Sequence, residues 1–130
     1  MTQRQQRVLI VDDEESIRRS LRAYLEDEGF DVVATGTGEE GLVTLSHEGV
    51  DVAIVDMRLP GMDGNAFIER AHHMCPGMTF FIYTGSVGYK VPFTLEAIGV
   101  GADHVFKKPL ADMSLLVEAM RRLLEARRGQ

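Results

Sequence analysis

The sequence predicts an α/β fold, a doubly wound sandwich in which helices cover both faces of a five-stranded parallel sheet. Short continuous apolar runs, such as those at 8–11 and 52–55, alternate with amphipathic stretches, and this alternation is typical of parallel strands that are buried on both sides. Right-handed crossovers between such strands place the helices on the two faces. The chain has 130 residues, of which 45% are hydrophobic. It therefore fits one domain with a single core that needs neither disulfides nor a structural metal.

Five segments rich in Val, Ile and Phe are predicted to be strands. We expect these strands near residues 7–12, 31–35, 51–56, 78–84 and 103–107. The segments between them are long enough for five helices, so strands and helices should alternate along the chain.

The first three helices are predicted from apolar residues at helical spacing. Leu21 and Leu25 lie on one side of the first helix, and Gly29 is placed to end it. A weaker pattern predicts a second helix that ends before Gly49 and a third that ends before Cys75.

The last helix carries a broad apolar stripe between residues 115 and 124, with Asp112 or Ser114 as its N-cap. Residues 85–93 contain two glycines and a proline without clear periodicity. We expect a loop there, the most mobile segment of the chain, leading into a short helix at 93–99.

Composition argues against nucleic-acid binding. The net charge of -6 and the pI near 5.1 disfavour direct binding of nucleic acid, because phosphate backbones need clustered cations. A late group of arginines is explained by the dipole of the last helix; its members are Arg121, Arg122, Arg127 and Arg128.

Cys75 is the single cysteine, so no intramolecular disulfide can form and nothing indicates an oxidising compartment. Residues 1–7 are polar and the apolar run after them is short. We therefore expect no signal peptide, no membrane span and a cytoplasmic protein.

Polar side chains stand at the carboxyl ends of four predicted strands. Asp12 and Asp13 follow the first strand, Asp56 ends the third, Thr84 ends the fourth and Lys108 follows the fifth. In doubly wound sheets, ligands bind at this edge. We therefore expect these side chains to form one site.

Three carboxylates at one edge repel one another, so either some are protonated or a cation lies among them. Taken alone, Asp12-Asp13 is more often a helix cap or a solvated turn. With Asp56 beside the pair, the oxygen ligands match those of Mg²⁺. No histidine cluster competes as a metal site: His72 and His73 are adjacent but should point apart on a helix, His47 and His104 stand alone, and all four are interpreted as structural.

With a metal on Asp12 and Asp13, Asp56 could act as a nucleophile toward a phosphoryl group and form an aspartyl phosphate. Lys108 would supply a positive charge for the phosphoryl oxygens, and the Thr84 hydroxyl could donate a hydrogen bond to them. Lys107 should point to the opposite face of its strand, toward solvent.

Over residues 7–127 the chain resembles the receiver domain of two-component response regulators. The matching motifs occur together and in order, which makes the resemblance specific. They are Val-Asp-Asp at 11–13, Asp-Met-Arg-Leu-Pro-Gly-Met-Asp-Gly at 56–64, Thr-Gly at 84–85, Gly-Ala-Asp at 101–103 and Lys-Pro at 108–109.

The resemblance implies a flavodoxin-like (βα)5 three-layer sandwich with strand order 2-1-3-4-5. It also implies that Asp56 accepts a phosphoryl group from the phosphohistidine of a sensor histidine kinase or phosphotransfer protein, or from a small acyl phosphate. Asp13 would bind Mg²⁺ directly, Asp12 through water, and the backbone carbonyl of Arg58 would complete the protein ligands. Thr84 and Lys108 would contact the phosphoryl group.

The resemblance further implies a receiver domain at 7–127, a disordered N-terminal tail at 1–6 and a C-terminal tail at 128–130. The chain departs from the family pattern at Val105, where many receivers have an aromatic switch residue. The segment before it, with Pro92, also looks longer than usual. We therefore expect residues 85–99 to carry more of the signal.

Two other functions remain open at this point. A magnesium-dependent aspartyl-phosphate phosphatase would need a second acid near its nucleophile, but Arg58 stands two residues after Asp56. A binding module that works without phosphorylation would keep the fold and lose the switch. The output could be a separate downstream protein or a fused effector domain, and a dimer formed on phosphorylation is neither required nor excluded by any pattern.

Overall fold

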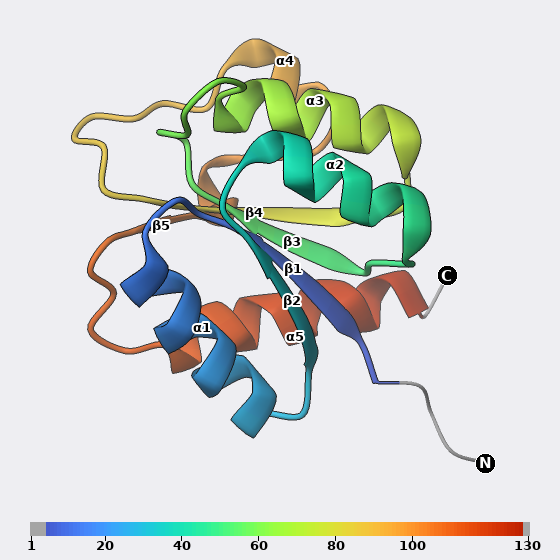
Figure 1. Cartoon of the computed structure of the whole chain (residues 1–130), viewed down its shortest axis with the longest axis vertical. Helices are drawn as coiled ribbons and strands as arrows, with labels where there is room; N and C mark the ends of the chain where they lie inside the picture. Colours follow the sequence, from blue (N-terminus) through green and yellow to red (C-terminus); the bar gives the residue numbers. More distant parts are fainter. Residues whose placement is uncertain (1–4, 129–130) are drawn as a thin grey trace.

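The computed structural model describes residues 5–128, and of the predicted tails residues 1–4 and 129–130 lie outside this range. A five-stranded parallel sheet with the order β2-β1-β3-β4-β5 forms the middle layer (Figure 1). Its strands are β1 (Arg7–Val11), β2 (Asp31–Thr35), β3 (Val52–Val55), β4 (Thr79–Thr84) and β5 (Val105–Lys107). The predicted fold class and strand order are confirmed.

Helices cover both faces of the sheet, with α1 and α5 on one side and α2, α3 and α4 on the other (Figure 1). Their bounds are α1 (Glu15–Asp27), α2 (Gly38–His47), α3 (Gly64–Met74), α4 (Phe93–Glu96) and α5 (Ser114–Arg128). No helix among the described residues is long and apolar enough to span a bilayer.

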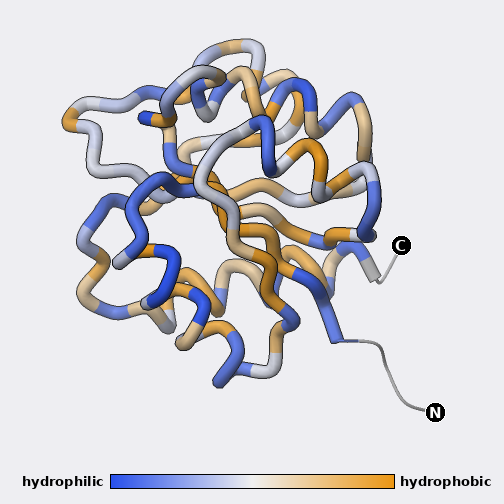
Figure 2. Tube along the Cα trace, viewed as in Figure 1, coloured by the Kyte–Doolittle hydropathy of each residue, from blue (hydrophilic) through white to orange (hydrophobic). Residues whose placement is uncertain are grey.

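The sheet divides the apolar interior into two clusters, so the single core expected from the sequence has two halves. One half packs Leu21 of α1 and Met120 of α5 against the sheet, and the other packs Phe67 of α3 and Leu95 of α4 against its opposite face. Along each strand, successive side chains point alternately into one half of the core and into the other. The hydrophobic strands in the middle of Figure 2 follow from this double burial.

Local capping explains where several helices begin and end. The Asp63 carboxylate accepts a hydrogen bond from the Ala66 amide at 2.8 Å, which satisfies an amide at the start of α3. Of the two N-cap candidates for α5, Asp112 caps the helix: its carboxylate accepts hydrogen bonds from the Ser114 amide and hydroxyl. After α1, Gly29 takes a positive φ of 94° and ends the helix as predicted.

Two predicted bounds are wrong. The helix expected at 93–99 stops at Glu96 because Gly99, at φ 94°, lets the Val100 amide turn back to the Leu95 carbonyl at 3.0 Å. The strand expected from residue 103 begins at Val105, because Ala102–His104 form a 3₁₀ turn in which the His104 amide donates to the Gly101 carbonyl. In both places local backbone hydrogen bonds decide the bound.

Candidate functional site

The buried polar or charged residues within 5–128 all lie at one edge of the sheet. They are Asp12, Asp56 and Thr84, with exposed fractions of 2%, 5% and 1%. Each stands at or just after the carboxyl end of its strand. Because burial of polar groups is costly unless they are paired, this clustering indicates a functional site.

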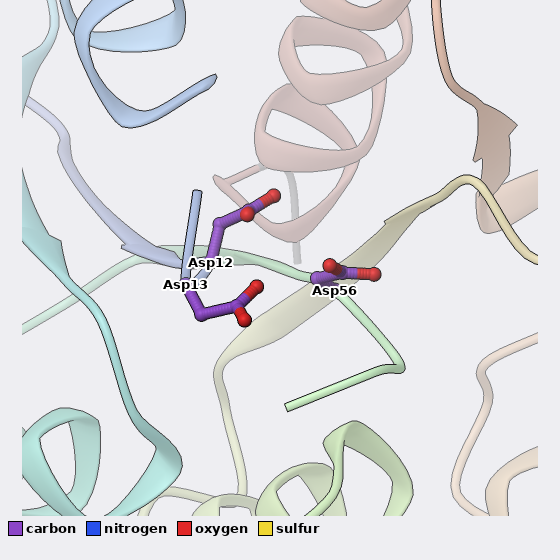
Figure 3. A group of neighbouring side chains, drawn as sticks. All are labelled: Asp12, Asp13 and Asp56. Carbon is purple, nitrogen blue, oxygen red and sulfur yellow. The ribbon is translucent and has the colours of Figure 1, made fainter. Parts of the chain in front are cut away.

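Asp12, Asp13 and Asp56 form an acidic group. One carboxylate oxygen from each lies within 4.8 Å of the others, and the three side chains lie together in Figure 3, where the end of β1 approaches the end of β3. Asp12 and Asp56 are buried and Asp13 is exposed, so the group opens to solvent on the Asp13 side. Such a set of oxygen ligands suits a hard divalent cation.

Lys108 places its ammonium group among these carboxylates. Its Nζ lies 2.7 Å from Asp12 Oδ2 and 3.1 Å from Asp56 Oδ2, while the lysine side chain is only 9% exposed. The Lys108 amide also donates to the Thr84 carbonyl at 2.9 Å. The sequence predicted that a cation or protonation would relieve the repulsion in this group, and the lysine does so in part.

The pKa values of both Asp12 and Lys108 are raised above their ordinary values. Burial raises the pKa of Asp12 above its ordinary value of 3.8, although hydrogen bonds from Lys108 and from the Glu14 amide oppose the shift. Burial lowers the pKa of Lys108, but hydrogen bonds and charges from Asp12, Asp56 and Glu14 outweigh burial and hold it above 10.5. Both shifts favour an added positive charge in the pocket.

The loop after Asp56 is held close to the site. The Arg58 amide lies 3.4 Å from Asp56 Oδ1, and the Gly64 amide donates to the Met57 carbonyl at 3.2 Å. A Cβ on Gly64 would overlap the backbone carbonyl oxygen of Asp56, so glycine is required where α3 begins against β3. The predicted role of the Arg58 carbonyl as a metal ligand stays a prediction.

Two residues at this site were not foreseen as members of it. The Glu14 carboxylate lies 3.1 Å from Lys108 Nζ, and Arg18 Nη1 donates to the Asp12 carbonyl at 2.8 Å. The position of Glu14, directly after Asp12-Asp13 at the same strand exit, is the signal that could have found it. Arg18 has no comparable signal, because its reach depends on how α1 packs.

Thr84 is tied to the segment that follows β4. Its Oγ1 accepts a hydrogen bond from the Ser86 amide at 3.1 Å. Farther along the same segment, the Tyr89 hydroxyl donates to Asn65 Oδ1 at 2.8 Å. The loop between β4 and α4 is therefore attached both to the site and to the first turn of α3.

Other residues considered in the sequence lie outside the site. His104 Nδ1 accepts a hydrogen bond from the Gly101 amide at 3.0 Å, and its ring lies 5.5 Å from that of Phe81, which agrees with a structural role. Lys107 is exposed, as expected. Val105 packs with the half of the core on the α3 side.

Comparison with known proteins identifies the family. The family model of the response regulator receiver domain matches residues 8–121. The chain belongs to this family. Because receiver domains are phosphoacceptors and not enzymes in their own right, the phosphatase alternative is set aside.

Two curated relatives are similar to this chain over most of its length. The transcriptional regulatory protein DctD of Rhizobium meliloti is 33% identical over 93% of this chain and 26% of the relative. The response regulator SaeR of Staphylococcus epidermidis is 32% identical over 85% of this chain and 47% of the relative. The receiver domain thus spans about a quarter to a half of the length of these relatives.

Solved structures show the same fold. A CheY-like receiver domain protein from Methanospirillum hungatei is 31% identical with a TM-score of 0.83, covering 97% of this chain and 98% of that one. The response regulator TrrA from Thermotoga maritima, solved in complex with Mg²⁺ and BeF, is 26% identical with a TM-score of 0.80, covering 91% and 98% of the two chains.

Proposed function

We propose that Asp56 is the phosphoacceptor of this receiver domain and that its phosphorylation switches an output surface. The observation that carries the proposal is the setting of the Asp56 carboxylate, which is buried, lies beside two further aspartates and is contacted by Lys108 Nζ at 3.1 Å. A purely structural buried carboxylate would need a positively charged partner, but it would not need two further aspartates beside it. The same partners suit an acceptor whose negative charge grows on modification.

The donor is proposed to be the phosphohistidine of a sensor histidine kinase or of a phosphotransfer protein, with small acyl phosphates as substitutes. Asp56 would attack phosphorus through a carboxylate oxygen as the bond from phosphorus to the histidine nitrogen breaks. Lys108 would neutralise charge on the phosphoryl oxygens. The Thr84 hydroxyl, which now accepts from Ser86, retains its own proton for donation to one of them.

Mg²⁺ fits the acidic group, because the three carboxylates offer oxygen ligands within 4.8 Å of one another. When bound, Mg²⁺ would neutralise the developing charge between acceptor and donor. Asp13 is proposed as its direct ligand because it is the exposed member, with Asp12 acting through water. Asp56 and the backbone carbonyl of Arg58 are proposed to complete the protein ligands.

The wider setting is also proposed from the family. The domain would comprise residues 7–127, work in the cytoplasm and bind no nucleic acid itself. It would pass its signal to a downstream protein or to a fused effector domain, either as a monomer or as a dimer formed on phosphorylation. Phosphorylation adds roughly -1.5 to -2 charges, and a bias of about 1 to 3 kcal/mol is enough to shift an output surface between two packings.

Intact mass after incubation with acetyl phosphate and Mg²⁺ tests the proposal. The unsubstituted chain should gain one phosphoryl group and Asp56→Asn should gain none. Asp27→Asn, which removes an exposed carboxylate from α1, should behave like the unsubstituted chain. A phosphoryl gain that survives in Asp56→Asn would place the acceptor elsewhere, and a lack of gain in every chain would support a module that works without phosphorylation.

A further inference from the structure

We propose that Glu14 is a positioning residue for Lys108: its carboxylate retains the lysine ammonium when a metal ion takes the aspartates. This inference rests on the proposed magnesium site. It concerns a side chain that is not a member of the acidic group, although the Glu14 backbone amide donates to Asp12 Oδ1 at 2.9 Å. It follows from the carboxylates that Lys108 contacts, some of which belong to the acidic group and one of which does not.

Lys108 Nζ has three carboxylate partners. Asp12 Oδ2 lies at 2.7 Å, Asp56 Oδ2 at 3.1 Å and Glu14 Oε1 at 3.1 Å. Asp12 and Asp56 belong to the group that could hold a metal ion, and Glu14 does not. A divalent cation in that group would therefore compete with the ammonium for two of its three partners and leave Glu14 as the third.

The Lys108 ammonium cannot readily move into bulk water when it loses the aspartates. The lysine side chain is 9% exposed, so moving the ammonium to bulk water would require the whole side chain to leave its packed position. A buried charge without a partner is costly. Glu14, at 56% side-chain exposure, lies at the mouth of the site and can hold the ammonium there while the aspartates turn to the metal.

The backbone leaves the Glu14 carboxylate free for this contact. Glu14 is the N-cap residue of α1 with an extended conformation, φ -87° and ψ 115°, yet its side chain accepts no capping hydrogen bond. N-cap side chains usually bond to the amides of the first turn. Here the side chain instead reaches across to β5, whose exit carries Lys108.

A double-mutant cycle on Mg²⁺ affinity tests the inference, with the dissociation constant measured by titrating MgCl₂ into the ¹⁵N-labelled chain and following amide shifts without a phosphoryl donor. Glu14→Gln should weaken Mg²⁺ binding about threefold to fivefold. Glu15→Gln is the matched control, because it removes the same charge one residue later from a side chain that pairs with Arg19 at 3.1 Å. It should change the affinity less.

The second half of the cycle repeats both substitutions in Lys108→Met. That background should bind Mg²⁺ more tightly, because the competing ammonium is gone, and Glu14→Gln and Glu15→Gln should then have the same small effect. An undiminished loss from Glu14→Gln in Lys108→Met would overturn the inference, since Glu14 would then act on the metal without the lysine.

Unfolding in urea, with and without saturating MgCl₂, gives a second readout. MgCl₂ should raise the unfolding midpoint less in Glu14→Gln than in Glu15→Gln, because the displaced lysine then lacks its third carboxylate partner, and equal rises would overturn the inference. If the unsubstituted chain bound no Mg²⁺, the magnesium proposal and this inference would fall together. If it bound Mg²⁺ and the two glutamate variants lost affinity equally, this inference alone would fall.

Discussion

Asp12 is a buried carboxylate whose charged form is disfavoured in the metal-free fold. Its pKa is raised by burial, and the hydrogen bonds from Lys108 and the Glu14 amide do not fully offset that effect. Its neighbours Asp13 and Asp56 bring further negative charge. The Asp12 carboxylate thus lowers the stability of the fold and at the same time helps to make a site that attracts a cation.

We therefore expect Asp12→Asn to raise the free energy of unfolding of the metal-free protein at neutral pH, because the neutral amide is spared the cost of burying the carboxylate charge. Because the folded pKa of Asp12 is raised, its ionised form costs stability above that pKa and costs nothing below the unfolded value near 3.8. The gain should shrink as the pH falls toward that value. Urea unfolding in EDTA across this range measures it.

Asp27→Asn, on the exposed side of α1, is the control and should show little change at any pH. In saturating Mg²⁺ the Asp12→Asn protein should instead be less stable than the unsubstituted chain, since the substitution then removes a carboxylate that helps to hold the ion. A gain that stays constant down to acidic pH would show that something other than the ionisation of Asp12 is responsible.

Among single residues, the sequence correctly predicted the site members whose position follows from the topology of the sheet alone. Asp12, Asp56, Thr84 and Lys108 stand at or just after strand ends, and parallel strands bring their carboxyl ends to one edge. The contact of Glu14 with Lys108 joins residues 94 positions apart. It depends on side-chain reach, which no local pattern encodes.

Among the elements, the start of α3 packs directly against the backbone of Asp56. Gly64→Ala should lower the free energy of unfolding by about 1 to 3 kcal/mol, because the new Cβ would overlap the Asp56 carbonyl and come within 2.8 Å of Met57 Cα. Acyl-phosphate labelling of Asp56 should slow as the loop shifts. Thermal unfolding and time-resolved intact mass measure the two effects.

Gly49→Ala is the matched control, since a Cβ at Gly49 would meet nothing within 4 Å and its φ is not positive. It should change neither stability nor labelling by much. Equal behaviour of the two variants would show that α3 can move away from β3 without cost, contrary to the tight contact described here.

A side-chain hydrogen bond helps to attach the loop between β4 and α4 to α3. Tyr89→Phe removes the donor to Asn65 Oδ1 and should cost about 0.5 to 1.5 kcal/mol. Amide hydrogen exchange should rise in residues 85–92 above that in the rest of the chain. Tyr24→Phe, on α1, should leave exchange in this loop unchanged, and an unchanged loop in Tyr89→Phe would contradict the attachment.

The element bounds that were predicted wrongly lie farther along the chain, in the connection between α4 and β5. Repeating strand and helix patterns predicted β1 to β4 to within one residue at either end, because burial on both faces leaves a strong apolar signal. The bounds of α4 and β5 depend on single turns at Gly99 and Gly101. Periodicity carries no information about such turns.

For the whole molecule, the two halves of the core and the acidic edge have opposite effects on stability: the core stabilises the fold and the acidic edge destabilises it. The packed strands and helices hold four strand exits in register, and the site at their end concentrates like charges that repel. The predicted fold class followed from alternating patterns over the whole chain, which average out local errors. The energetic balance between core and site could not be predicted in this way, because it depends on how far each carboxylate is buried.

That balance leads to a prediction about metal removal. A ligand that binds only the folded state stabilises it by about 1.4 kcal/mol when its concentration is tenfold above the dissociation constant. For a domain of this size we expect Mg²⁺ at such a concentration to raise the thermal midpoint by about 3 to 6 °C, and EDTA to reverse the rise. Asp13→Asn should abolish most of it, because Asp13 is the open carboxylate of the acidic group. NaCl at matched ionic strength is the control, since screening alone would relieve part of the repulsion; an equal rise with NaCl would show that the pocket responds to salt in general and holds no bound ion.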